Sequence, residues 1–148
     1  MRMAMIAVIF RLAILADISS IYALDHIAAQ GNEGRREFIR HAIQERNCIV
    51  ATWNDKIAGY AVLEYTFFGC GFISMVYVHS DYRRQQIGHG LIEYLEQICK
   101  TPKLFTSTNL SNLPMQALLG RQGYVISGEI QNLDEGDPEL VYFKAVRF

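Results

Sequence analysis

The sequence predicts one mixed α/β (α+β) domain, built as a single mixed sheet with helices on both faces. Three observations lead to this class. The chain has 148 residues, a common length for one domain, so we expect residues 1–148 to fold together. Hydrophobic residues make up 51% of it, which favours a packed core over disorder. Strand-like and helix-like segments follow one another in the order β-α-α-β-β-β-α-β-α-β-β, without an internal repeat or linker.

Charge and composition argue against several classes of partner. Fifteen acidic and fourteen basic residues leave the chain almost neutral, so we expect neither nucleic acid nor a membrane surface as a partner. The apolar N-terminal segment is interrupted by Arg11 and Asp17 and is too short to span a bilayer. Cys48, Cys70 and Cys99 form no CxxC pair. We therefore expect free thiols in a reducing cytoplasm and no metal site.

The N-terminal half is predicted to contain three strands and two helices. Asp17, Ser19 and Ser20 form an N-cap region, after which apolar residues recur at helical spacing. Asn54-Asp55 is a hairpin signal between two strand-like runs. The predicted strands are 5–15, 48–53 and 56–68, and the predicted helices are 18–27 and 35–46.

The C-terminal half is predicted to contain four strands and two helices. Residues 68–71 form a second turn, Pro102 follows the end of a helix, and Gly123 is typical of the residue that closes one. The predicted strands are 72–78, 104–108, 124–130 and 140–146, and the predicted helices are 87–99 and 112–122.

The most informative stretch runs from Val76 to Leu91. A β-branched strand leads through a basic, glycine-bearing turn directly into an amphipathic helix. The unpaired N–H groups and the dipole of a helix start attract an anion, and Arg83 and Arg84 add positive charge. A Walker-type loop is excluded because Leu91 and Ile92 follow the glycines in place of Lys and Ser or Thr. A dinucleotide fingerprint is excluded because Glu93 occupies the position of its third glycine. We therefore expect the turn to bind a pyrophosphate group.

This turn resembles the acyl-CoA-binding motif Arg/Gln-x-x-Gly-x-Gly/Ala of the GNAT superfamily of N-acyltransferases. Tyr82-Arg83 and Ile87-Gly88 take the family positions, and Gln86 then stands where the first glycine is usual. A second register, through Gln85, Gly88 and Gly90, also satisfies the pattern. We prefer the first register because it aligns the preceding strand and the following Leu91 as well. It requires a backbone at Gln86 that tolerates a side chain.

A second segment resembles the same family at the expected distance downstream. The run Asn112-x-x-Met115-x-x-Leu118-Leu119-x-x-x-Gly123-Tyr124 is similar to Asn-x-x-Ala-x-x-Leu/Phe-Tyr-x-x-x-Gly-Phe/Tyr. In the family this helix lines the pantetheine arm of CoA. Asn112 would cap the helix or bond the pantetheine, whereas the apolar residues are expected in the core.

The resemblance implies a mostly antiparallel sheet whose two central strands, 72–78 and 104–108, splay apart and admit acetyl-CoA. The pantetheine would pair with strand backbone near Val76 and Val78, and the pyrophosphate would lie on the N–H groups of the turn. The residues expected to bind acetyl-CoA are Val76, Tyr77, Val78, Arg83, Arg84, Gln85, Gln86, Ile87, Gly88, His89, Gly90 and Asn112.

The resemblance implies an N-acetyltransferase in which a primary amine attacks acetyl-CoA directly. An amine with a pKa of about 10 must lose a proton first, and Glu64 is the carboxylate candidate for that base. Leu119 replaces the tyrosine that usually reprotonates CoA. Tyrosines that could substitute for it are Tyr65, Tyr77 and Tyr142. We expect His79 to be structural.

The missing tyrosine keeps an alternative open, a non-catalytic acyl-CoA-binding sensor or regulatory module. A nucleotide-binding domain that shares only the turn is a third option. The loop 134–139 carries four acidic residues, which favours a cationic small-molecule or peptide amine as acceptor if the loop lies near the acceptor entrance. A solvated hairpin tip is the simpler explanation of the loop. A monomer and a homodimer both fit the sequence.

Overall fold

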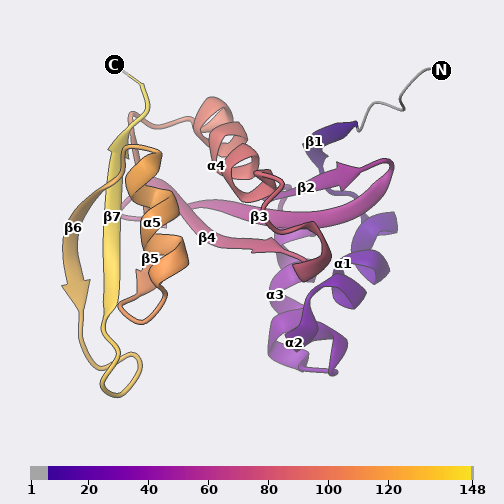
Figure 1. Ribbon diagram of the computed structural model, residues 1–148, viewed down its shortest axis with the longest axis horizontal. Coiled ribbons are helices and arrows are strands. Elements are labelled where there is room, and N and C mark those ends of the chain that lie inside the picture. Colours follow the sequence, from indigo (N-terminus) through magenta and orange to yellow (C-terminus); the bar gives the residue numbers. More distant parts are fainter. Residues whose placement is uncertain (1–6, 148) are drawn as a thin grey trace. The chain divides into compact units, whose positions relative to one another are not determined.

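The computed structural model describes residues 7–147 and shows a mixed α/β fold with a mostly antiparallel sheet (Figure 1). Hydrogen bonding links its strands in the order β1-β2-β3-β4-β5-β7-β6. The strands are β1 (Val8–Leu12), β2 (Cys48–Trp53), β3 (Lys56–Phe67), β4 (Cys70–Val78), β5 (Lys103–Asn109), β6 (Val125–Ile130) and β7 (Glu139–Ala145). The helices are α1 (Ile18–Leu24), α2 (His26–Ala29), α3 (Glu33–Gln44), α4 (Ile87–Ile98) and α5 (Leu113–Arg121), with 3-10 turns η1 (Leu15–Asp17) and η2 (Ser80–Tyr82).

The described residues form two compact units. Unit 1 contains residues 7–62 and 75–94, and unit 2 contains residues 63–74 and 95–147. In unit 1, β2 pairs antiparallel with both β1 and β3. In unit 2, β7 pairs antiparallel with both β5 and β6. The β4–β5 pair is parallel over three residue pairs, from Gly71–Leu104 to Ile73–Thr106. Most of β4 therefore lies beyond this ladder.

The core of unit 1 is built from α1, α3 and the strands β2 and β3. Ile21 of α1 and Ile39 of α3 pack with Val50, Tyr60 and Val62, and all five are fully buried. Their spacing explains the burial, because alternate strand residues and every third or fourth helix residue lie on one face.

Asp25 joins three elements of this unit through one carboxylate. Its Oδ1 accepts the N–H groups of Ile27 and Ala28, which begin α2, at 3.0 and 3.2 Å. Its Oδ2 accepts the Tyr60 hydroxyl of β3 at 2.6 Å and the Arg35 guanidinium of α3 at 2.7 Å. Burial by itself would raise the pKa of Asp25, but these hydrogen bonds and the charge of Arg35 outweigh it. The pKa of Asp25 therefore lies below its ordinary value.

In unit 2, α5 has clear start and stop residues. Asn112 accepts the N–H of Met115 at 3.1 Å, and Gly123 follows the helix with φ +88°. Leu119 is fully buried. Near the C-terminus, the Arg147 guanidinium donates to the carbonyls of Gln97 and Cys99 at the end of α4.

Two sequence predictions were wrong near the N-terminus. The helix predicted over 18–27 is two helices, because the Asp25 side chain bonds the N–H groups that would otherwise continue α1. The strand predicted over 5–15 spans only Val8–Leu12 and is followed by η1. Met5 and Ile6 of that prediction lie outside the described residues.

The two predicted turns are present. Asn54 and Asp55 have φ values of +47° and +70°, and Phe68 and Gly69 have +53° and +73°. These are the left-handed conformations of two-residue hairpin turns. The second turn is tighter than predicted, so β4 begins at Cys70 and not at Phe72.

Replacing Asp25 with alanine should destabilise the protein by about 3–5 kcal/mol, because Arg35 and the Tyr60 hydroxyl lose their buried partner. Glu37→Ala is the control, since its ion pair with Arg40 is exposed and should contribute less than about 1 kcal/mol. Urea unfolding measures both.

The Asp25 contribution should also depend on pH in a defined direction. The pKa of Asp25 is lowered in the fold, so its stabilisation is present above the ordinary carboxyl pKa. It should be lost as the pH falls through the lowered value. Equal losses of stability in Asp25→Ala and Glu37→Ala would contradict this role.

Candidate functional site

The end of β4 directs part of its backbone away from β3. The His79 N–H donates to the Ala58 carbonyl of β3 at 2.9 Å. Successive residues of a strand direct their N–H and C=O groups to alternate edges. Tyr77 is therefore directed toward β3 like His79, whereas Val76 and Val78 are directed to the opposite edge. The backbone groups of Val76 and Val78 are therefore the ones that can pair with a ligand, whereas the Tyr77 side chain contacts His26 and Tyr60.

The turn after β4 is fixed by short-range contacts. His79 Nδ1 accepts the Asp81 N–H at 3.2 Å and so caps η2. The Tyr82 ring lies 6.0 Å from the Trp53 ring and 6.3 Å from that of His79, centroid to centroid. These contacts agree with the structural role expected for His79.

Two residues of the turn have left-handed backbones. Arg84 has φ +66° and Gln86 has φ +60°, a region that favours glycine. Gln86 is the residue that stands at the usual glycine position of the preferred register, and the positive φ there favours that register. Left-handed residues in a turn also bring successive N–H groups to one side, which makes a concave site for an anion.

Helix α4 begins directly after this turn. The Gly90 N–H donates to the Gln86 carbonyl at 3.0 Å and makes the first turn of the helix, so the N–H groups of Ile87 and Gly88 have no acceptor within α4. Gly90 itself is required by packing. A Cβ atom there would lie 2.3 Å from the Phe10 ring.

The side chains around the helix start supply positive charge. Arg83 and Arg84 are exposed, and neither guanidinium makes a hydrogen bond or ion pair within residues 7–147. His89 lies 3.2 Å from Glu93 one turn along α4. The two arginines are therefore free to contact an anion held by the turn.

Asn112, predicted either to cap a helix or to bond the pantetheine, caps α5 in unit 2. Its side-chain oxygen is used by the Met115 N–H. Its other side-chain group, the amide NH₂, makes no hydrogen bond to another described residue.

The predicted catalytic candidates have different surroundings. Glu64 on β3 is partly buried, and its carboxylate makes no hydrogen bond or ion pair with residues 7–147. The Tyr65 hydroxyl accepts the Lys100 N–H at 3.1 Å, and burial raises the pKa of Tyr65. Tyr142 is buried. The Tyr77 hydroxyl lies 2.8 Å from Nδ1 of the His26 imidazole.

The acidic loop before β7 is partly tied down. Asp134 accepts the Asn109 side-chain amide at 2.8 Å, and Asp137 accepts the N–H and the hydroxyl of Ser111 at 2.9 and 2.6 Å. These two carboxylates have a structural role in unit 2. Glu135 and Glu139 carry the other two negative charges of the loop.

Sequence reasoning missed two residues of this region. No local sequence pattern pointed to His26, because its hydrogen-bond partner Tyr77 is 51 positions away in the chain. The Ser74 hydroxyl of β4 is buried without a hydrogen-bond partner in the described part of the chain. Buried polar atoms are rarely left unpaired, so Ser74 marks a place where a ligand or water would be bound.

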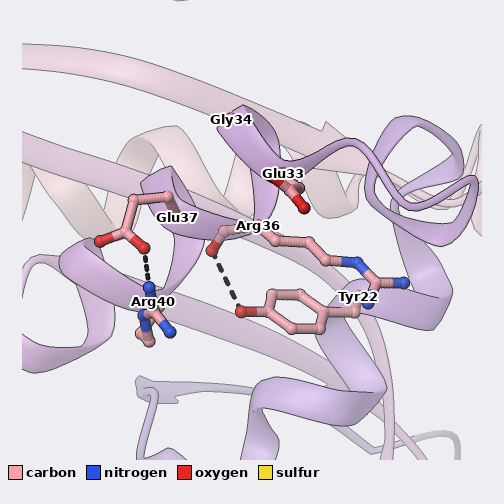
Figure 2. Close-up of a pocket in the computed structure, with 6 residues that line it drawn as sticks. All are labelled: Tyr22, Glu33, Gly34, Arg36, Glu37 and Arg40. Atoms are coloured by element: carbon pink, nitrogen blue, oxygen red, sulfur yellow. Dashed lines mark hydrogen bonds and ion pairs between the residues drawn. The ribbon is translucent and has the colours of Figure 1, made fainter.

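Two surface cavities lie elsewhere in unit 1. One of about 630 Å³ is lined by Tyr22, Glu33, Gly34, Arg36, Glu37 and Arg40. Figure 2 shows Arg36 lying along the Tyr22 ring while Arg40 points to Glu37. The other, of about 520 Å³, lies beside η2 and the Asn54-Asp55 turn. Neither is lined by residues predicted to bind acetyl-CoA.

Within the described residues, no three His, Cys, Asp or Glu side chains gather closely enough to hold a metal ion. The three cysteines are free, and burial raises the pKa of Cys48 to about 12. None of the helices between residues 7 and 147 is long and apolar enough to cross a membrane.

A family model and a solved structure both match this chain to GNAT acetyltransferases. Residues 15–124 match the model of the family described as Acetyltransferase (GNAT) family. A GNAT-family acetyltransferase from Bacillus cereus is 34% identical, with 98% of this chain and 99% of that chain covered and a TM-score of 0.87. A search of curated proteins finds no match.

Two more distant solved structures share the fold. The ribosomal-protein-S18-alanine N-acetyltransferase of Escherichia coli is 18% identical, with 96% of each chain covered and a TM-score of 0.77. Naa50 of Arabidopsis thaliana, in complex with the bisubstrate analogue CoA-Ac-MVNAL, is 18% identical over 93% of this chain and 98% of that one, with a TM-score of 0.75.

The left-handed backbone at Gln86 predicts an unusual response to glycine. Gln86→Gly should change the free energy of unfolding by less than about 1 kcal/mol, because relief of the left-handed conformation offsets the extra chain entropy of glycine. Gln85→Gly is the matched control, since Gln85 lacks a positive φ, and it should destabilise by about 0.5–1 kcal/mol. Urea unfolding measures both variants. A larger loss of unfolding free energy in Gln86→Gly than in Gln85→Gly would refute the left-handed backbone at Gln86.

Proposed function

Because the chain belongs to the GNAT acetyltransferase family, we propose that this acyltransferase transfers an acetyl group from acetyl-CoA to a primary amine by direct attack. The observation that carries the proposal is the turn between β4 and α4. It combines two left-handed residues, a helix start with unpaired N–H groups and two arginines without partners. This combination suits a pyrophosphate.

Different groups of the chain bind the pyrophosphate and the pantetheine of acetyl-CoA. In this proposal the N–H groups of residues 84–88 hold the pyrophosphate, and the guanidinium groups of Arg83 and Arg84 add charge-assisted contacts. The backbone of Val76 and Val78, directed away from β3, pairs with the pantetheine amides. Gln85, His89 and Gly90 complete the predicted set around the turn, with Gly90 allowing the close approach of Phe10.

The acceptor is a small-molecule or peptide amine. Acetyl-CoA supplies an acetyl group activated as a thioester. The amine nitrogen bonds to the acetyl carbon, the carbon–sulfur bond breaks, and CoA leaves with the electron pair. The Val76 N–H is directed to the edge where an oxyanion can be stabilised. Leu119 is buried and donates no proton, which a thiolate leaving group with a pKa of about 8.5 does not require. Glu64 is the sequence-derived candidate for the base.

Support for a peptide acceptor comes from Naa50, whose bisubstrate analogue joins CoA to the peptide MVNAL. The acidic residues Glu135 and Glu139 favour a positively charged acceptor. The free cysteines suit a cytoplasmic location.

Gly88→Glu tests the anion site. A carboxylate at the second residue of α4 should repel the pyrophosphate and weaken acetyl-CoA binding at least about 100-fold, a loss comparable with that of a well-made charge-assisted contact. Calorimetric titration measures the binding, and thermal unfolding confirms the fold.

Gly34→Glu is the matched control, because Gly34 is the second residue of α3 and receives the same charge. It should bind acetyl-CoA as the wild type does. Unchanged affinity in Gly88→Glu would overturn the proposed anion site. Acetyl-CoA binding without thiol release across a panel of amines would indicate a sensor in place of an enzyme.

A further inference from the structure

His26 and Tyr77 form a pair of side chains in unit 1 that the predicted mechanism does not use. The Tyr77 hydroxyl lies 2.8 Å from His26 Nδ1 and 3.1 Å from the His26 backbone N–H. The two rings are 6.0 Å apart at an interplanar angle of 35°. His26 is exposed and Tyr77 is half-buried. The pair therefore connects β4 with solvent at the start of α2.

The hydrogen bonds constrain where the protons lie. A backbone N–H can only donate, so the Tyr77 oxygen accepts from His26 N–H. A tyrosine hydroxyl has one proton and further acceptor capacity. When the Tyr77 hydroxyl donates its proton to His26 Nδ1, the imidazole carries its own proton on Nε2. The Tyr77 oxygen then keeps one lone pair that can accept from one more donor.

The pair is held in place by the buried Asp25 network. Tyr60, whose hydroxyl is bound by Asp25, stacks on the Tyr77 ring with centroids 6.0 Å apart and planes 25° apart. Asp25 also fixes the first N–H groups of α2 immediately after His26. Both partners of the hydrogen bond are thus positioned by one carboxylate.

We propose that Tyr77 and His26 form a proton relay that deprotonates the acceptor amine, with Tyr77 touching the amine and His26 taking the proton. This inference rests on the proposed function, because it places the relay beside Val76, whose N–H is assigned to the thioester oxygen. Tyr77 is the next residue on β4, and its hydroxyl is the polar group that the strand offers there.

The proton transfer balances in a single step. The acceptor ammonium gives one proton to the Tyr77 oxygen while the Tyr77 hydroxyl proton moves to His26 Nδ1. Tyr77 ends neutral, His26 ends as imidazolium, and the amine ends neutral with its lone pair ready for attack. The exposed imidazole then releases a proton to solvent from Nε2. The remaining proton lost by the nitrogen on acylation is the one that the departing thiolate takes up.

The charged groups packed around His26 do not compete for this role. Asp25 is occupied by Tyr60, Arg35 and two N–H groups. On α3, the Arg35 charge is matched by Asp25, and Arg36 donates to the Ala28 carbonyl and lies over the Tyr22 ring. On β3, Tyr60 faces Asp25, and on β4 the facing group is Tyr77.

His26→Gln and Tyr77→Phe test the relay, each measured as kcat/KM for an amine that the wild type acetylates, from pH 5 to 9. Both variants should lose about 100-fold in kcat/KM, the low end for a general base. The low-pH limb of the wild-type profile, where kcat/KM falls, should disappear in His26→Gln. Acetyl-CoA affinity by calorimetry should stay within twofold of the wild type.

His41→Gln and Tyr22→Phe are the matched controls. His41 is an exposed histidine of α3, and within residues 7–147 the Tyr22 hydroxyl bonds only the Arg36 carbonyl. Both should keep the wild-type profile. Glu64→Gln separates the two candidate bases, because Glu64 is the base candidate derived from the sequence.

A second readout does not depend on turnover. The ¹⁵N chemical shifts of the His26 imidazole should report the Nε2–H tautomer in the wild type and lose the Nδ1 hydrogen-bond signature in Tyr77→Phe. If the wild type is active and His26→Gln keeps both its kcat/KM and the low-pH limb, the relay is overturned while the proposed function stands. Loss of the limb in Glu64→Gln would also overturn it and assign the base to Glu64. A wild type that binds acetyl-CoA but acetylates no amine would overturn both the relay and the proposed function.

Discussion

The buried carboxylate of Asp25 is the interaction on which the rest of unit 1 depends. It begins α2, fixes Arg35 of α3 and accepts the Tyr60 hydroxyl of β3. The Tyr60 ring in turn supports Tyr77 on β4. A lone buried charge would be costly, but here every hydrogen bond to it comes from a group that also needs a partner. One side chain thus links α2 and α3 to β3 and, through the Tyr60 ring, to β4.

The turn after β4 shows how function and local stability oppose each other. Arg84 and Gln86 occupy backbone conformations that glycine would adopt without strain. The same conformations gather N–H groups at the start of α4, and the arginines beside them are left unpaired. Neither Arg83 nor Arg84 makes an ion pair within residues 7–147, which is the feature on which the proposed anion site rests.

Local patterns in the sequence were sufficient for much of the fold and for the elements that carry the candidate site. The hairpin at Asn54-Asp55, the cap at Asn112 and the stop at Gly123 depend on neighbouring residues, and all three are present. The start of α4 directly after the β4 turn was predictable for the same reason. The break between α1 and α2 was not, because the Asp25 carboxylate is recruited by Tyr60, 35 positions away. The His26–Tyr77 pair was equally invisible, since its two members meet only once β4 lies against the α1–α2 region.

The most direct test of the anion site is to follow the backbone amide signals of the ¹⁵N-labelled protein while acetyl-CoA is added. The largest chemical-shift changes should fall on the N–H groups of residues 84–88, with smaller changes at Val76 and Val78. Inorganic pyrophosphate should reproduce the changes at the turn and leave Val76 and Val78 unmoved. Changes centred on the cavity formed by Tyr22, Arg36 and Arg40, with residues 84–88 unaffected, would contradict the assignment of the β4–α4 turn as the acetyl-CoA site.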